Sequence, residues 1–522
     1  MLSTHIQTLL NNLKKDSKKA FNAYESDTLI HVNNITSKVG AFYEKVRYFV
    51  DYKDDHTIRR SAIERILKRK IRFESGTATS LPLIQELIRG GYLSNDSIPE
   101  SVAKDIQKII DIFVQVREIL KDAHVSSAVH EKLISILGSS IDSFFYPQFI
   151  EDSVTQAMYE ISVQKIRVEK ITDEERVRKQ IYIACRRSLL KNDDETLLYA
   201  LWLRYSGIAS LSELPSAEII AGQFVVVCNT ISCDVKDHLG WQLTAKLRNY
   251  ALYFSLVRDV INKYGVESES VLGDPAYLDK TVTDILQHAY KNEYGRIYKS
   301  STRAIVYIFC TKIILALAVE LPYEYFLLHS TSYVPLAINI LFHPLLLLTM
   351  TRSIRPLGAS NTSLAIAGLH SVLYDAGDTK VIKVKPKGSY GFIGTVFALV
   401  YLAVFGVTLS VILSVLNALK FNWVSICLFL LFLSLVSYFG LRIRHTAQRL
   451  KIHTGNESSF AVLWNIFTLP IINLGQWMTR SFSTINIFVF TMDFLIEAPF
   501  KFILGFSDSF ISYIKDKKDE TF

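Results

Sequence analysis

The residues of this sequence that could do chemistry are charged or titratable side chains inside long apolar runs. Lys312 lies in the middle of the run RAIVYIFCTKIILALAVEL, and Glu320 lies near its end. His343 lies beside Pro344 in a second apolar run. A charge inside a bilayer is costly and often marks an ion pathway, and a His titrates near neutral pH. These three side chains are the first candidates for a polar intramembrane site.

Lys312 has two interpretations, a transport charge or a structural charge that fixes helix packing. Each central apolar residue favours insertion by about 0.3–0.6 kcal/mol, and a central Lys opposes it by roughly 2.5–3.5 kcal/mol. The run 303–321 is therefore marginal as a span on its own. Glu320 follows eight residues later, which is about 12 Å along a helix. We therefore expect the partner of Lys312 to come from another helix.

The last apolar segment, 484–506, offers acidic partners for Lys312. Asp493 and Glu497 share one arc of this predicted helix with other polar residues, and apolar residues fill much of the rest. Such a stripe could face Lys312 across a bundle, or could face water while the helix lies flat at the membrane surface. Several charges in one span are costly, which favours the flat or partly embedded helix.

Basic helix surfaces form a second kind of candidate. Residues 59–72 carry seven basic side chains against one acidic one. Such a helix could lie on an anionic leaflet or bind nucleic acid, or could be a packed helix with a solvated face, which is the more common case. The membrane-surface candidates are Arg59, Arg60, Lys68 and Arg69 here, and Arg442 and Arg444 after a later apolar run.

No motif supports an enzyme. The sequence contains no HExxH, GxSxG or GxxxxGK[ST] pattern and no protein-kinase set. Cys228, Cys233 and His238 could be drawn as a metal cluster, but their spacing matches no common zinc pattern, and free thiols are the simpler interpretation. We expect no catalytic residue, no cofactor and no metal.

The elements that must position these residues are predicted to be helices. Through the first 300 residues proline is scarce and apolar residues recur at three- and four-residue spacing. Ser97 and Glu100 have capping-box spacing, which predicts a helix that starts at Ser97. Asp274 resembles an N-cap followed by proline, which predicts a helix that runs towards the membrane. A single helix is expected over 233–264, and the run 219–231 is expected to be a buried core helix or a strand.

Apolar segments gather after Arg303 and predict four to six membrane spans. Lys and Arg are abundant before the first segment, after the second and after the fourth, and are scarce in the other loops. Because these residues collect on the cytoplasmic side, we expect both termini in the cytoplasm and an even number of spans. The segments assigned to membrane helices are 303–321, 333–350, 391–418, 421–441 and 460–478.

The sequence therefore predicts an all-α protein, with a helical cytosolic N-terminal region followed by a polytopic α-helical membrane domain. Five thinly spread cysteines and the lack of a signal peptide suit a cytosolic first half. The expected divisions are a segment with a basic helix (1–80), a cytosolic helical region (81–300), membrane helices (301–481) with a cytosolic loop (351–390), and an amphipathic or embedded helix with a charged tail (482–522).

These features favour an inner or plasma membrane protein with a non-enzymatic role, as an anchor, scaffold or assembly factor. Its expected partners are the lipid bilayer and a protein bound by the cytosolic region. The alternative is a transporter or channel with a polar path around Lys312. Nucleic acid is not expected as a partner, because the residues before Arg303 are nearly neutral, with 40 basic and 39 acidic side chains.

Overall fold

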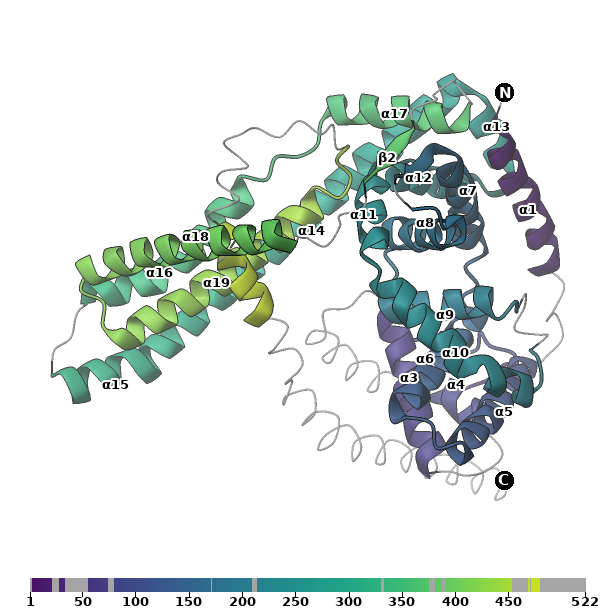
Figure 1. The fold of residues 1–522 in the computed structure, drawn as a ribbon, viewed down its shortest axis with the longest axis horizontal. Coiled ribbons are helices and arrows are strands. Elements are labelled where there is room, and N and C mark those ends of the chain that lie inside the picture. Colours follow the sequence, from purple (N-terminus) through teal and green to yellow (C-terminus); the bar gives the residue numbers. More distant parts are fainter. Residues whose placement is uncertain are drawn as a thin grey trace, which may run out of the picture. The chain divides into compact units, whose positions relative to one another are not determined.

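The structure is a computed structural model, and it describes residues 2–20, 28–32, 55–73, 79–169, 171–208, 214–329, 333–374, 381–385, 391–452, 468–469 and 471–478. Most of the expected fifth span, and the whole of 482–522 with Asp493 and Glu497, lie outside these residues. The described chain forms two compact units (Figure 1). The N-terminal unit comprises 3–258 and 379–386, and the C-terminal unit comprises 259–378 and 387–486.

The N-terminal unit is built from helices packed around an apolar core. Most of its buried side chains are Ile, Leu, Val and Phe, as expected where the hydrophobic effect holds the helices together. Its helices are α1 (Thr4–Ala20), α3 (Asp55–Phe73), α4 (Ser80–Arg89), α5 (Glu100–Asp122), α6 (Ser127–Phe145), α7 (Phe149–Lys165), α8 (Glu174–Leu189), α9 (Asp194–Tyr205), α10 (Ala217–Lys236), α11 (His238–Lys246) and the first part of α12 (Arg248–Tyr264).

Helix α5 shows how the apolar spacing positions this core. Its buried residues recur every three or four positions and place Phe113 against Trp202 of α9, with 5.8 Å between ring centroids. The helix begins at Glu100, so the predicted start at Ser97 is wrong. Pro99 takes the N-cap position in an extended conformation, and the Ser97 hydroxyl donates to the carbonyl of Ser94 instead.

The segment 217–264 differs from the prediction in two ways. The run 219–231 belongs to α10, a helix with one face buried in the core, so the strand alternative is wrong. The single helix expected over 233–264 is instead divided among α10, α11 and α12. The break between the first two falls at Asp237, which caps α11 by accepting a hydrogen bond from the backbone N–H of Leu239.

A short parallel sheet is the exception to the predicted all-helical fold within the described residues. β1 (Ile166–Val168) pairs with β2 (Ile382–Val384), with Ile166 opposite Ile382. Strand β2 comes from the expected loop 351–390. That segment therefore contributes a strand to the N-terminal unit, as well as a helix to the C-terminal unit.

The C-terminal unit contains the apolar helices. Its elements after α12 are α13 (Ser268–Gly273), α14 (Pro275–Leu315), η3 (Ala316–Glu320), α15 (Leu321–Tyr323), η4 (Glu324–Leu328), α16 (Tyr333–Arg352), α17 (Ala359–Leu373), α18 (Gly391–Ala418) and α19 (Trp423–Ala447). The predicted start of α14 is confirmed, because the Asp274 side chain accepts from the backbone N–H of Ala276 at 3.0 Å. The helix continues through two π-helical turns, η3 and η4.

Helices α14, α16 and α19 pack against one another, and α18 runs beside them (Figure 1). At one end of this bundle an apolar cluster joins Ile297 of α14, Ile354 after α16 and Ile443 of α19. A second cluster joins Leu416 at the end of α18 to Phe429 of α19. The four helices therefore form one packed group that can position a site between them.

Candidate functional site

The buried polar residues of the C-terminal unit meet between α14, α16 and α19. Lys312 is 2% exposed, and its ammonium group donates a hydrogen bond to the side-chain oxygen of Asn339 at 2.8 Å. The side-chain nitrogen of Asn339 donates to Glu320. One amide on α16 therefore joins the predicted Lys and the predicted Glu of the preceding helix. Lys312, Glu320 and Asn339 form the core of what we call the polar cluster.

His343 extends the polar cluster to α19. It lies one turn after Asn339 on the same face of α16, and its side chain is fully buried. Its Nδ1 lies 3.2 Å from the carbonyl oxygen of Asn339, and its Nε2 lies 3.0 Å from the carbonyl oxygen of Phe429. A carbonyl oxygen only accepts, so a neutral imidazole donates to one of these oxygens and a protonated imidazole donates to both.

An aromatic ring closes the polar cluster on the side of α19. The Nζ atom of Lys312 lies 4.1 Å from the ring centroid of Phe432, a distance at which the ring face attracts a cation. The same ring lies 5.9 Å from the His343 ring, centroid to centroid. Lys312 is therefore held by an amide oxygen and a ring, with Glu320 one hydrogen bond further away.

The helix geometry explains how Glu320 reaches this position. It ends the π-helical turn η3, which shifts the residues that follow it around the helix axis. Glu324 begins the second π-helical turn, is also buried, and accepts a hydrogen bond from Asn422 at 2.8 Å. The same Asn422 caps α19 by accepting from the N–H of Ser425. Two acidic residues of this helix are thus tied to the neighbouring helices.

The outer surface of the bundle is apolar, whereas its interior holds the polar cluster as well as apolar side chains. Leu399 on α18, for example, is 61% exposed. A helix surface of this kind suits contact with lipid, because lipid tails are as apolar as Leu. Other large apolar side chains exposed on these helices are Val306, Tyr307, Ile314, Leu317, Leu345, Val400, Leu402, Val407, Val411 and Val415.

Basic side chains surround one end of the bundle, near the cluster of Ile297, Ile354 and Ile443. Among them are the predicted Arg442 and Arg444, which are exposed near the end of α19. The other exposed basic residues of these segments include Lys291, Lys299, Arg303, Arg352, Arg355 and Lys451.

Asn361 holds three chain segments together at this basic end. Its side-chain nitrogen donates to the hydroxyl of Tyr290 and to the carbonyl of Leu450, each at 2.8 Å. Its side-chain oxygen accepts from the N–H of Ile452 at 2.8 Å. Tyr290 lies before the first predicted span, Asn361 after the second, and Leu450 and Ile452 after the fourth. These three segments therefore meet at one buried amide.

The predicted basic helix of the N-terminal unit is α3, and most of its candidate residues bind carboxylates within that unit. Arg59 donates to Asp142 and lies over the ring of Tyr146. Arg60 is buried and Arg69 donates to Glu86. Lys68 is exposed. These internal contacts neutralise much of the charge that a leaflet would attract.

The contacts of Arg60 form a second buried charged site. Its guanidinium donates to both carboxylate oxygens of Asp193, at 2.9 and 2.8 Å, and also to Glu195. Burial works against the charge of Arg60, but the hydrogen bond and the charges of the nearby carboxylates outweigh it and raise the pKa of Arg60. Burial raises the pKa of the neighbouring Glu64, with a further contribution from Glu195.

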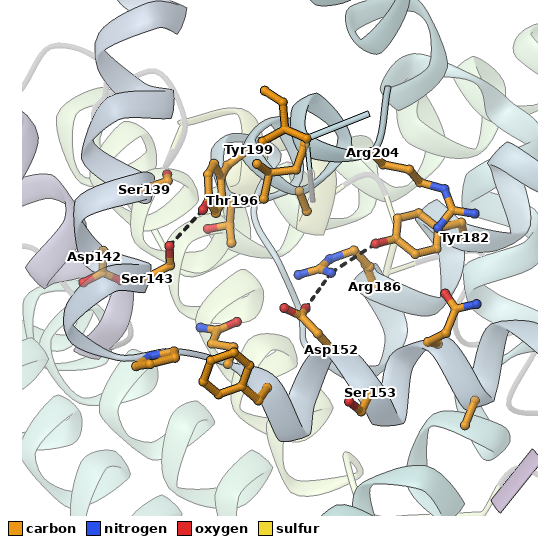
Figure 2. Close-up of a pocket in the computed structure, with 18 of the residues that line it drawn as sticks. Ser139, Asp142, Ser143, Asp152, Ser153, Tyr182, Arg186, Thr196, Tyr199 and Arg204 are labelled. Carbon is orange, nitrogen blue, oxygen red and sulfur yellow. Dashed lines mark hydrogen bonds and ion pairs between the residues drawn. The ribbon is translucent and has the colours of Figure 1, made fainter. Parts of the chain in front are cut away.

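A cavity in the N-terminal unit was not predicted from the sequence. Its volume is about 780 Å³, and side chains from α1, α3, α6, α7, α8 and α9 line it (Figure 2). Arg186, Tyr182 and Asp152 lie on one side of the view, and Ser143 and Tyr199 lie on the other. No sequence motif could have indicated this cavity, because its residues come from helices far apart in the chain.

Asn339 and Phe432 were also missed, although one signal pointed to the first. Asn339 is a polar residue inside an apolar run, four positions before His343, and this spacing places both on one helix face. Asp493 and Glu497 lie outside the described residues. Across the part of the chain that the structure describes, no group of three His, Cys, Asp or Glu side chains could hold a metal ion.

Fold and site together define a helical, multi-pass membrane protein. Five described helices are long and apolar enough to cross a membrane by length and composition, namely α10, the long helix that starts with α14, α16, α18 and α19. Comparison of the chain with models of known protein families, with characterised proteins and with solved structures finds no match. The function has to be inferred from the site itself.

Proposed function

We propose that this protein is a non-enzymatic membrane anchor and scaffold, or assembly factor, whose N-terminal unit binds a protein partner. The polar cluster carries the proposal. Lys312, Glu320, Asn339 and His343 are each at most 2% exposed, and their hydrogen bonds join three helices. A buried network of this kind fixes the packing of helices in a bilayer, where apolar contacts give little drive for association.

We also propose that the N-terminal unit lies on the cytoplasmic side of an inner or plasma membrane, with both termini there. Two observations support this side assignment. Strand β2, between the second and third spans, pairs with β1 of the N-terminal unit, so the two strands must share one side of the membrane. The basic residues gather around the segments that meet at Asn361, and such residues collect on the cytoplasmic side.

Water access to the polar cluster tests the anchor role directly. Single cysteines placed at 312, 339 and 343 in a cysteine-free protein should react slowly with a charged maleimide in membranes, because an anchor needs no wet path. A cysteine at Lys420, in the loop between α18 and α19, is the positive control. Rapid labelling at 312 and 343 would reject the anchor role of this cluster.

Accessible tags test the side assignment. A tag at Lys383 should be reached from the cytoplasmic side, and tags at Ser330 and Lys420 from the opposite side. A tag at Arg480 distinguishes four membrane spans from six. Arg480 follows the fifth predicted segment and lies on the outer side if there are six spans, so labelling from the cytoplasmic side would reject six. Labelling of Lys383 and Ser330 from the same side would overturn the proposed arrangement.

A transporter or channel is the second candidate function, and His343 is the observation that favours it. Each ring nitrogen faces a carbonyl oxygen, an arrangement that changes with protonation. Under this alternative, Lys312→Leu abolishes flux in reconstituted vesicles. A protein that shows flux, and loses it on this substitution, would favour the transporter over the anchor.

A further inference from the structure

The cavity of the N-terminal unit contains a cation with an unused hydrogen-bond donor. Arg186 on α8 is 6% exposed. Its Nη1 atom donates to Asp152 at 2.8 Å and to the hydroxyl of Tyr182 at 3.2 Å (Figure 2). Its Nε atom is buried and has no partner among the described residues. An unpartnered donor on a buried charged group is costly, so an acceptor at this place would stabilise the protein.

The acid that partners Arg186 is easy to displace. The Asp152 side chain is 56% exposed, whereas that of Arg186 is almost fully covered. An ion pair with an exposed member is weak, since water competes for it. Burial works against the charge of Arg186, but Tyr182 and Asp152 favour it, and the pKa of Arg186 lies above its ordinary value. The guanidinium therefore stays charged and available to another anion.

A second guanidinium lies against the ring of Tyr182. Arg204 on α9 lines the same cavity, and its Cζ atom lies 4.2 Å from the ring centroid of Tyr182. The Cζ atom of Arg186 lies 6.0 Å from the same centroid. Arg204 is exposed, and its Cζ atom also lies 5.2 Å from the ring centroid of Tyr159. Two arginines beside one tyrosine ring form a site suited to a carboxylate or a phosphate.

The rest of the cavity combines an apolar wall and neutral hydroxyl groups with ionisable side chains that already have partners, since Asp142 binds Arg59, Glu160 binds His5 and Arg60 binds Asp193. Tyr199 and Ser143 hydrogen-bond to each other at 2.8 Å, and burial raises the pKa of Tyr199 to about 12, so its hydroxyl stays neutral. A volume of about 780 Å³ lies in the range of small-molecule sites. The apolar lining residues include Phe144, Pro147, Phe149, Leu203 and Ile208.

We propose that this cavity binds a small organic anion, with its carboxylate or phosphate held by Arg186 and Arg204 in place of Asp152. The apolar or aromatic body of the ligand lies against the wall that includes Phe149 and Leu203. The inference goes beyond the anchor role, because it gives the N-terminal unit a small-molecule ligand.

Binding of simple probes to the full-length protein in nanodiscs tests the proposal. The probes are benzoate, phenyl phosphate, inorganic phosphate and the neutral benzamide, each measured by calorimetry at constant ionic strength. At least one of the two aromatic anions should bind tenfold more tightly than both inorganic phosphate and benzamide. The aromatic anion that binds more tightly shows whether the site prefers a carboxylate or a phosphate. Equal binding of benzamide, or no binding of any probe at millimolar concentration, would overturn the proposal.

Three variants assign the binding to this cavity. Arg204→Gln should weaken binding of the aromatic anion at least tenfold. Asp152→Asn should tighten it several-fold, because the competing carboxylate is removed. Lys121→Gln, which removes an exposed cation on α5 that does not line the cavity, should leave it unchanged. Since Asp152 is largely exposed, its substitution also gives a result if Arg204→Gln fails to fold. Unchanged affinity in Asp152→Asn, or equal effects of Arg204→Gln and Lys121→Gln, would count against the site.

Discussion

The two units of this protein differ in the side chains that they expose and in the partners of the charged groups that they bury. In the N-terminal unit most of the covered residues are apolar, as Phe113 and Trp202 illustrate. In the membrane bundle Lys312, Glu320 and His343 are covered together with apolar side chains such as Leu347, while side chains such as Leu399 are exposed. In the cytoplasmic location proposed for the first unit, water drives apolar groups together. Lipid gives no such drive in the second, and polar contacts and close packing hold the helices.

Each unit also buries basic side chains, and Arg60 and Lys312 differ in their partners. Arg60 contacts three carboxylates, two of which belong to side chains that still reach solvent. Lys312 contacts one neutral amide and one ring, and its acid lies one hydrogen bond further away. Water can replace part of a lost contact at Arg60, whereas the bilayer cannot do so at Lys312. The membrane site should therefore tolerate single charge changes less well.

The largest contrast between the units is expected from apolar truncation. Phe113→Ala removes a covered ring from a water-driven core and should cost about 3–5 kcal/mol of unfolding free energy. Leu399→Ala, at an exposed position on α18, should cost less than about 1 kcal/mol, because its side chain lies in apolar surroundings in both states. Hydrogen exchange of α5 and α18 in nanodiscs measures both. Similar losses of unfolding free energy at Phe113 and Leu399 would contradict the view that water surrounds the unit of α5 and lipid surrounds α18.

Charge removal at the polar cluster should produce the next largest effect. Lys312→Met leaves Glu320 covered without its cation, and Glu320→Gln leaves the lysine without its acid. Each should cost about 3 kcal/mol, the lower end of the range for breaking a buried ion pair. The double variant should lie within about 1 kcal/mol of the wild type, because neither charge remains. Unfolding of the bundle in detergent gives the four free energies.

If the losses of unfolding free energy in Lys312→Met and Glu320→Gln simply add in the double variant, the two residues are not coupled through Asn339. Asn339→Leu provides the independent check, since it removes the bridging amide and keeps both charges. It should be at least as destabilising as either single charge variant. Val306→Ala, at an exposed apolar position of the same helix, is the control for simple truncation.

Local signals in the sequence predicted much of the fold. The apolar spacing predicted the helices, and the pair Asp274 and Pro275 predicted the first residue of α14, because capping depends on adjacent residues alone. The same reasoning failed at Ser97. Pro99 adopts an extended conformation at the N-cap, and the capping box that would use Ser97 cannot form around it.

The candidate site was only partly predictable, for a different reason. Lys312, Glu320 and His343 stand out as polar residues in apolar runs, so the sequence alone identifies them. Which neighbour meets Lys312 depends on how two helices pack and in what register, and a single sequence does not contain this information. The cavity around Arg186 is harder still to predict, since each of its helices contributes only a few residues.

The reactivity of single cysteines tests which unit lies in water and which in lipid. Cys233 on α10 and Cys310 on α14 are both exposed in the protein structure. If α10 belongs to the water-soluble unit, Cys233 should react with a charged maleimide at least about tenfold faster than Cys310 in membranes, because the reactive thiolate does not form in lipid. Burial raises the pKa of Cys185 to about 12, so this thiol should stay unreactive and serve as the control. Slow labelling of Cys233 would place α10 in the membrane.

The smallest effect we expect is the pH dependence of the charged site around Arg60. Burial of Asp193 favours its neutral form, but the hydrogen bonds from Arg60 and Thr196 outweigh this and lower its pKa. A carboxyl group with a lowered folded pKa stabilises the fold above its unfolded value of about 3.9, and this contribution is lost as the pH falls further. Asp193 caps α9 by accepting from the backbone N–H of Thr196 at 2.8 Å, and Asp193→Asn keeps this cap and removes the charge. Its stability should therefore decline less between pH 5 and pH 3 than that of the wild type.

Glu64 beside it should show the opposite sign. Its pKa is raised, chiefly by burial, so protonation as the pH falls towards its unfolded value of about 4.3 relieves a penalty and favours the fold. Glu64→Gln removes this compensation and should make the acid decline steeper than in the wild type. Hydrogen exchange in α3 and α9 across the same pH range measures all three proteins. Parallel curves of stability against pH for the three proteins would show that the surroundings of Arg60 leave the titration of Asp193 and Glu64 unchanged.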